Sequence, residues 1–251
     1  QVKIVDIGHD NFDSACEALE LGSVDMAVVD MAQLIRMEKN DENLPYGVVI
    51  SGVLKRGDSR YVMIRKRHAK DLIENAVVAT DSYSKTERIK HMYDGISCIV
   101  ETDIRKCIEK LDASECDAVF VLLEDIKAAR LHNSFLYRYT IMDYGECVPV
   151  HGEGVYAMLT KGKKEAVRTA RELSHKSTAE CFEIEDDIIS RVMQNVYVKT
   201  CDVYARISSD RLEIYADVTG NRGRIRVNER GTFVNKNLII TKIVDRISKS
   251  M

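Results

Sequence analysis

Residues 24–35, VDMAVVDMAQLI, predict the kind of fold that the chain adopts. The run from Val24 to Asp30 is rich in apolar residues, which favours a strand buried on both faces, as central strands of parallel sheets are. Asp30 stands where this strand ends and a turn is expected. Functional groups of α/β proteins gather at strand ends, so Asp30 is a candidate acid. The plainer interpretation is that its carboxylate caps the next turn or helix.

Strand-like and helical runs alternate over the first 160 residues, which is typical of parallel α/β architecture. Strands are predicted in the runs 2–8, 24–30, 44–54, 61–66, 76–81, 97–102 and 117–123, and helices at 12–22, 84–93 and 104–112. From 163 to 194 the pattern is helical. Three further runs, 196–208, 211–219 and 224–229, predict an antiparallel meander, and a last helix begins near Val234. The second part is therefore a separate α+β domain.

The composition excludes some classes of partner. The 251 residues carry a formal net charge of -3, and 45% of them are hydrophobic. A general nucleic-acid binder needs a basic face, so no nucleic-acid partner is expected. No apolar run approaches the ~20 residues of a membrane span, so no membrane partner is expected either. No sequence feature indicates self-association, and we expect a monomer.

The cysteines point to a reducing compartment. There are seven of them, scattered along the chain without a CxxC pair. Neither a zinc site nor a disulfide framework is therefore predicted, and we expect no metal. Reduced thiols of this kind are typical of cytosolic proteins, so a cytoplasmic location is expected.

Several segments, taken in order, resemble the porphobilinogen deaminase (hydroxymethylbilane synthase) family. LPYGVVISGVLKRGDSR at 44–60 is similar to the family's L-P-x-G-L-x-x-x-A-V-x-x-R-x-D-P-R, and AVVATDSYSKTERI at 76–89 to A-V-V-G-T-S-S-L-R-R-Q-x-Q-L. KLDASECDAVFVLLEDIKAARL at 110–131 and VPVHGEGVYAM at 148–158 also match family segments. The resemblance runs from about Phe12 to Tyr215.

The resemblance implies a fold with three domains. Two periplasmic-binding-protein-like (type II) α/β domains would enclose a cleft, followed by a small C-terminal α+β domain with a three-stranded antiparallel sheet. The first domain would comprise 1–58 and 149–166, the second 59–148, and the C-terminal domain 167–251. The family's first strand and helix have no counterpart before Gln1, so we expect the natural chain to be longer upstream.

The resemblance also implies an activity. Family members join four porphobilinogen molecules with release of ammonia, on a dipyrromethane cofactor attached to a cysteine. An aspartate manages protons, and arginines pair with the many substrate carboxylates, which suit the guanidinium fork.

Most of that equipment is substituted here. The catalytic aspartate falls on Gln33, which cannot ionise, and the neighbouring lysine falls on Ala32. Family arginines that would bind substrate are replaced at Ser84, Lys85, Glu101 and Cys107. Thr80 and Ser82 precede a predicted helix, whose N–H groups would hold a ligand carboxylate or only receive an ordinary cap.

The position for cofactor attachment is also changed. The family cysteine falls on Tyr197, whose phenol cannot form the thioether. Cys201, four residues downstream, is the alternative anchor, but it lies in a strand pattern without an evident activating field. We therefore expect the dipyrromethane cofactor to be missing.

Two further residues carry alternatives. His151 and Glu153 flank Gly152 in a predicted tight turn. They are either an acid–base pair or turn residues at a hinge between domains.

Three functional hypotheses remain. The leading one is a divergent family member without standard condensation, which binds a small anionic or pyrrole-type ligand. The second is an active hydroxymethylbilane synthase that uses Asp30 as its acid and Cys201 as its anchor. The third is a structural or regulatory paralogue with an empty cleft.

Overall fold

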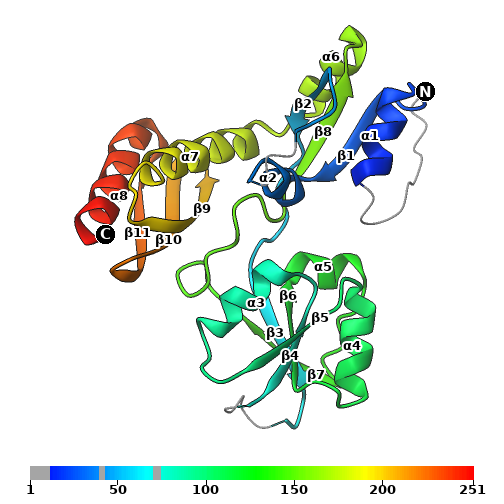
Figure 1. Ribbon diagram of the computed structural model, residues 1–251, viewed down its shortest axis with the longest axis vertical. Coiled ribbons are helices and arrows are strands. Elements are labelled where there is room, and N and C mark those ends of the chain that lie inside the picture. Colours follow the sequence, from blue (N-terminus) through cyan, green and yellow to red (C-terminus); the bar gives the residue numbers. More distant parts are fainter. Residues whose placement is uncertain (1–11, 40–42, 70–74) are drawn as a thin grey trace.

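The computed structural model describes residues 12–39, 43–69 and 75–251, and its strands form three separate sheets. The strand predicted at 2–8 lies outside the described residues. Two of the sheets belong to α/β units, and the third lies with two helices at the C-terminal end of the chain (Figure 1). Within the described residues, no helix is long and apolar enough to cross a membrane.

The first sheet has the order β1-β8-β2, formed by β1 (Met26–Asp30), β8 (Tyr156–Lys161) and β2 (Val48–Val53). Both pairings are antiparallel. Helix α1 (Phe12–Glu20) covers one face, where Val29 and Leu159 are buried in the same core as Leu19. Helix α6 (Lys164–Leu173) packs on β2 and β8. The pairing of β1 with β8 is antiparallel rather than parallel as predicted, and the central position of β1 stays a prediction because the strand expected at 2–8 lies outside the described residues.

The chain continues from β1 directly into a helix rather than a turn. Helix α2 (Met31–Lys39) begins immediately after Asp30. The sequence there contains no glycine or proline before Pro45. Met31 and Leu34 are buried in the core of the first unit at helical spacing. This placement carries Gln33 away from the strand end and into the first turn of α2.

The second unit is a five-stranded sheet of order β5-β4-β6-β3-β7. Its strands are β3 (Tyr61–Lys66), β4 (Val77–Thr80), β5 (Ser97–Val100), β6 (Ala118–Leu122) and β7 (Tyr137–Ile141). β4 is parallel to β5 and β6, whereas β3 is antiparallel to β6 and β7. Helices α3 (Tyr83–Lys90), α4 (Ile104–Asp112) and α5 (Leu123–Ala128) pack against it. The sequence predicted α4 with the same bounds but missed α5 and β7.

The C-terminal unit confirms the predicted meander. Helix α7 (Lys176–Val192) leads into β9 (Val198–Ser208), β10 (Arg211–Gly220) and β11 (Gly223–Thr232), followed by a short 3-10 turn and α8 (Lys236–Ser250). The sheet order is β11-β10-β9, with both pairings antiparallel. Apolar residues alternate along β10, and the buried face packs against α7 and α8.

Two segments, 54–60 and 142–155, join the first unit to the second (Figure 1). The second segment contains Gly152 and Gly154, at φ values of 86° and 72° that favour glycine. A Cβ at Gly152 would meet Ile35 Cδ1 at 2.6 Å, and one at Gly154 would meet Ser59 Oγ at 2.5 Å. The turn that contains Gly152 and Gly154 therefore packs closely against Ile35 of α2 and Ser59 of the segment 54–60. The residue limits of the three domains stay a prediction.

Candidate functional site

A pocket of about 370 Å³ lies between the first and second units, where β1, β4 and β6 end. Its lining comes from five places: the start of α2, the start of α3, the end of β5, the start of α5, and the turn that precedes β8. The lining residues are Asp30, Ala32, Arg36, Asp81, Ser82, Tyr83, Ser84, Lys85, Val100, Thr102, Leu122, Asp125, Glu153, Gly154 and Tyr156. Five of these, Asp30, Ser82, Ser84, Lys85 and Glu153, were candidates from the sequence.

Asp30 serves as the cap of α2. Its Oδ1 accepts a hydrogen bond from the backbone N–H of Gln33 at 3.2 Å. Burial raises the pKa of Asp30, although the hydrogen bonds from the Gln33 and Ala32 amides lower it in part. The capping interpretation of Asp30 therefore describes its contacts, and its carboxylate also lines the pocket.

Lys85 is the most deeply buried cation of the pocket, with 4% of its surface exposed. Its Nζ donates to both carboxylate oxygens of Asp81, at 2.6 and 2.7 Å, and lies 3.7 Å from Glu153 Oε1. Burial opposes the charged form, but Glu153 and Asp81 together raise the pKa of Lys85 above its ordinary value. Lys85 is therefore charged and is already occupied by the protein's own carboxylates.

Glu153 is held within the turn before β8. Its Oε2 accepts hydrogen bonds from the Val150 amide at 3.2 Å and from the Tyr61 hydroxyl. Burial raises the pKa of Glu153, with Lys85 acting in the opposite direction. His151 points instead toward Glu185 and Asp186. The two residues have different partners and no contact with each other as an acid–base pair is seen; their role as turn residues at a hinge between domains stays a prediction.

Negative charge dominates the pocket. Four carboxylates, of Asp30, Asp81, Asp125 and Glu153, line it together with two cations, Lys85 and Arg36. This excess of negative charge affects the pKa of Asp125. Burial and the nearby Asp81 and Asp30 carboxylates raise that pKa to about 6, although Lys85 lowers it in part. Like charges that share a site disfavour ionisation of each other. The pocket is thus poorly suited to a ligand that carries several carboxylates.

The start of α3 is the part of the pocket that could hold an anion. Ser82 is the N-cap of α3, and its side chain makes no capping hydrogen bond to the helix. Its hydroxyl lies 3.1 Å from that of Ser84 instead. A free helix N-terminus attracts anions, but Asp81 stands directly before this one. The sequence-based alternative of an anion site here stays a prediction.

Four of the predicted acid and substrate-binding positions, Gln33, Thr80, Glu101 and Cys107, are not among the lining residues. The side chain of Gln33 belongs to a helix, and Thr80 is fully buried at the end of β4. Cys107 is fully buried in the core of the second unit, where its Sγ lies 3.2 Å from the Glu101 carbonyl. Burial raises the pKa of the Cys107 thiol to about 12. The structure therefore uses Cys107 for packing.

The two candidates for cofactor attachment lie in the C-terminal unit. Tyr197 is 55% exposed in the turn before β9, and Cys201 is 5% exposed in the hydrophobic core beneath that sheet. Neither residue lines the pocket. Tyr197 has no thiol, and Cys201 would have to leave the core to react, so these residues do not fit an attached dipyrromethane.

A network of ion pairs, which sequence reasoning missed, joins the three units beside the pocket. The guanidinium of Arg56 donates to both carboxylate oxygens of Glu185, at 2.6 and 2.9 Å, and Glu185 also lies 3.3 Å from His151. Arg88 of the second unit pairs with Asp202 and, at 3.3 Å, with Asp217 of the C-terminal sheet. In the sequence, this network was signalled by Asp202 and Asp217, two charged residues within otherwise apolar strand patterns.

His151 is a charged member of this network. Its Nε2 lies 2.8 Å from Asp186, and its ring stacks on Phe182 with centroids 4.7 Å apart. Burial opposes the charged form, but the hydrogen bonds to Asp186 and Glu185 raise the pKa of His151 to about 9. The imidazolium therefore helps to neutralise Glu185, whose own pKa is lowered by Arg56 and His151 against the effect of burial.

Comparison with known proteins identifies the family. The family described as "Porphobilinogen deaminase, dipyromethane cofactor binding domain" matches residues 10–169, which is more than half of the chain. The chain belongs to the porphobilinogen deaminase family. Members of this family are expected to carry the dipyrromethane cofactor.

Curated relatives agree at low identity. The porphobilinogen deaminase of Chlorobium luteolum is 24% identical over 192 residues, which cover 75% of this chain and 60% of the relative. That of Clostridium acetobutylicum is 21% identical over 218 residues, covering 81% and 74%. A probable porphobilinogen deaminase of Picrophilus torridus is 23% identical, covering 67% and 61%. The chain thus spans about 60% of the length of the first of these relatives.

Two solved structures are similar to parts of the chain at low identity. An ABC transporter structure from Parabacteroides distasonis has a TM-score of 0.47 at 15% identity, covering 78% of this chain and 69% of that one. The VFT2 domain of Bordetella pertussis BvgS has a TM-score of 0.45 at 16% identity, covering 66% and 68%. The chain has two α/β units and a separate three-stranded antiparallel sheet.

Proposed function

We propose that this protein is a divergent member of the porphobilinogen deaminase family that binds a small ligand in its cleft without the standard condensation. The observation that carries the proposal is the charge of the pocket, where four carboxylates face two cations. Substrates of the standard reaction carry several carboxylates, which such a site repels. The substitutions at Gln33 and Tyr197 point the same way.

The helix starts around the pocket strengthen this argument. In an anion site, helix N-termini are left for the ligand. Here Asp30 caps α2, Asp81 stands before α3, and Asp125 lies in the first turn of α5. Asp30 therefore occupies the start of α2, whereas the caps of α3 and α5 make no side-chain hydrogen bond and Asp81 and Asp125 only place negative charge beside them. Asp81 also occupies Lys85. A neutral or positively charged ligand suits this arrangement better than the anionic ligand expected from the sequence.

The size of the pocket suits one small molecule. A volume of about 370 Å³ lies within the usual range for small-molecule sites, which begins near ~300 Å³. Tyr83 and Tyr156 offer exposed aromatic surface at its rim. An aromatic face beside carboxylates favours a ring or an organic cation. A pyrrole-type ligand without several acid groups would satisfy both features.

The second candidate function is an active hydroxymethylbilane synthase with displaced residues, Asp30 as acid and Cys201 as anchor. Asp30 favours it in one respect, since its carboxylate lines the pocket and burial raises its pKa. Cys201 disfavours it, because the thiol lies within the apolar core of another unit. The third candidate function is a structural or regulatory paralogue with an empty cleft. It differs from the other two in predicting that no small ligand stabilises the protein.

Mass spectrometry of the intact protein, together with porphobilinogen consumption, tests the proposal. The enzyme of Clostridium acetobutylicum, prepared in parallel with its cofactor, serves as the positive control. We expect the mass of the unmodified chain and no consumption of porphobilinogen. A covalent dipyrromethane adduct, or turnover comparable to that of the control, would refute the proposal. A thermal-shift screen of neutral and cationic heterocycles against matched carboxylated analogues then tests the cleft: stabilisation by the first group alone is expected, and no stabilisation by either would favour the empty paralogue.

A further inference from the structure

The outer face of the C-terminal sheet carries an excess of positive charge. This face lies opposite the one that packs on α7 and α8, and the strand register defines its residues. Its charged members are Arg206, Arg211, Arg224, Arg226, Arg230, Asp202, Glu213 and Asp217. Five arginines thus share the face with three carboxylates, in a chain whose overall charge is -3. Concentrated charge of this sign attracts anionic partners.

The arginines follow one strand closely. Arg224, Arg226 and Arg230 lie on β11 together with Asn228, at alternate positions that share one face. Side chains two residues apart on a strand lie about 6.6 Å from each other. Arg224 and Arg226 both pair with Asp217 of β10, and the Nε of Arg226 lies 3.5 Å from the Asp217 carboxylate. Asn228 and Arg230 are exposed.

β11 is also the edge of its sheet. β10 pairs with it on one side, and no described strand pairs with it on the other. A two-residue turn joins Gly220 to Gly223, so the alternating antiparallel pattern directs the backbone groups of Arg224, Arg226, Asn228 and Arg230 away from β10. The Asn228 carbonyl, for example, accepts a hydrogen bond from Arg246 of α8 at 3.2 Å. Such an edge is a template for another strand.

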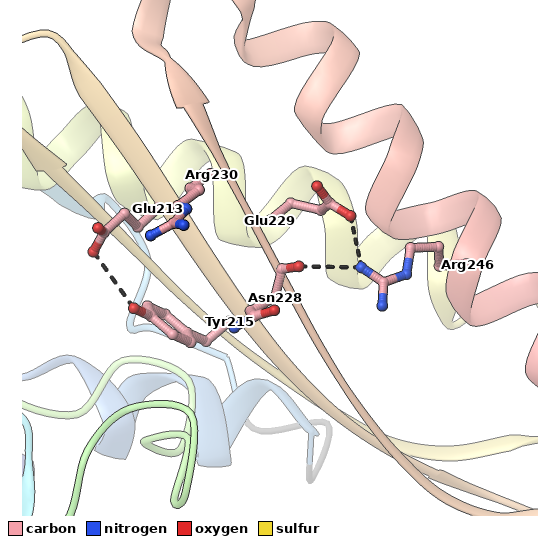
Figure 2. A pocket seen from close by; sticks show the side chains of 6 residues that line it. All are labelled: Glu213, Tyr215, Asn228, Glu229, Arg230 and Arg246. Atoms are coloured by element: carbon pink, nitrogen blue, oxygen red, sulfur yellow. Dashed lines mark hydrogen bonds and ion pairs between the residues drawn. The ribbon is translucent and has the colours of Figure 1, made fainter.

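A depression of about 460 Å³ lies at this edge (Figure 2). It is lined by Glu213, Tyr215, Asn228, Glu229, Arg230 and Arg246. Arg246 reaches it from α8 and is held by Glu229 at 2.6 Å. The depression leaves room for the side chains of an added strand beside the guanidinium groups of Arg230 and Arg246, with the carboxylates of Glu213 and Glu229 also in its lining.

The same face is poorly suited to nucleic acid. Bases of single strands need exposed aromatic rings on which to stack. Tyr204 is buried under Tyr144, with ring centroids 4.1 Å apart, and Tyr144 also covers part of Tyr215 at 5.8 Å. The aromatic side chains of this face are therefore already used for contact with Tyr144 of the connecting segment 142–155.

We propose that the open edge of β11 binds an extended acidic segment of a partner protein, which adds to the sheet as a fourth strand. Its backbone would pair with the outward groups of β11, and carboxylates at every second position would lie opposite Arg226 and Arg230. The arginines discourage apolar strands from adding at the same edge, which gives the site its selectivity. This inference does not depend on the ligand of the cleft.

The test uses a fluorescein-labelled peptide of alternating glutamate and valine and measures its binding to the full chain by anisotropy. We expect the double variant Arg226→Ala with Arg230→Ala to weaken binding about tenfold, because two exposed pairs with carboxylates are lost. Lys242→Ala, on the exposed face of α8, is the matched control and should leave the dissociation constant unchanged. Thermal unfolding checks that all variants are folded.

A second peptide, N-methylated at every amide, keeps the charge but has no N–H group left to form the strand ladder. We expect it not to bind. The proposal is overturned if the N-methylated peptide binds as well as the first, if the double variant binds as tightly as the parent chain, or if the first peptide does not bind. Tighter binding of single-stranded oligouridine than of the peptide would also overturn it, in favour of a nucleic-acid surface.

Discussion

The cleft pocket and the ion-pair network beside it use the same residue types in opposite ways. In the network, Glu185 is 1% exposed and meets both Arg56 and His151, so its negative charge is neutralised. In the pocket, burial and the neighbouring Asp81 and Asp30 carboxylates raise the pKa of Asp125 to about 6, although Lys85 lowers it in part. Balanced charge gives rigidity, whereas unbalanced charge remains available to a ligand.

This contrast separates stability from function. The network joins residues more than 100 positions apart and fixes how the three units meet. The pocket lies between two of those units and keeps charges that reduce stability, as binding sites commonly do. Substitutions in the network should therefore damage the fold, and substitutions in the pocket should leave it unchanged or strengthen it.

The largest effect is expected at Glu185. Replacing it with alanine leaves the Arg56 guanidinium buried without its carboxylate, which costs about 3–5 kcal/mol of unfolding free energy. Urea denaturation of Glu185→Ala measures the loss. Glu183→Ala, on the exposed face of the same helix, is the control and should change the free energy little. Equal losses in the two variants would mean that the ion pair has no special role.

A smaller, pH-dependent effect is expected at His151. Its pKa is about 9 in the folded chain and ordinary in the unfolded chain, so its contribution is fully present below pH ~6.5 and is lost as the pH rises through about 9. The contribution is at most about 3 kcal/mol. Unfolding free energies of the parent chain and His151→Asn should converge between pH 6 and 10. A constant difference across that range would contradict the prediction.

Neutralising a pocket carboxylate should act in the opposite direction. The pKa of Asp125 is raised in the folded chain, so its ionisation penalises the fold, and stability falls as the pH rises from 4 through about 6. Asp125→Asn should therefore raise the unfolding free energy at pH 7.5 by about 1–2 kcal/mol. Glu109→Gln, exposed on α4, is the control. A loss of stability in Asp125→Asn would show that the carboxylate is paired after all.

The smallest effect is expected at Gln33. Restoring the family residue with Gln33→Asp should change stability by less than about 0.5 kcal/mol, because the side chain is half-buried in the first turn of α2 and lines no part of the pocket. We also expect no porphobilinogen consumption from this variant. Measurable turnover after this single change would mean that the position is catalytic.

The sequence predicted most of the elements but not how they pair. Alternating apolar residues specified the C-terminal meander, and α4 was placed at its observed bounds. The antiparallel pairing of β1 with β8 was missed because two strands 130 residues apart leave no local signal of their direction. Helix α2 was missed because its polar residues, such as Gln33 and Arg36, hide an apolar side formed by Met31 and Leu34.

For the candidate site, the motif resemblance located the region but not its charge. It brought Lys85, Ser82, Ser84 and Asp30 to one pocket. Asp81 and Asp125 were not considered, because their effect depends on three strand ends meeting in space. The contacts of Cys107 and Cys201 could not be predicted either, since the spacing of a cysteine does not reveal whether a core surrounds it.

The ion pairs that cross between the three units have a consequence for how the molecule comes apart. Arg88 ties the second unit to the C-terminal sheet, and Arg56 and His151 tie the first unit to α7. A unit that detached would leave buried charges of its neighbours without partners, which is unfavourable. The three units should therefore melt together in one cooperative transition, and a protease acting on the native chain should release no stable fragment that corresponds to a single unit.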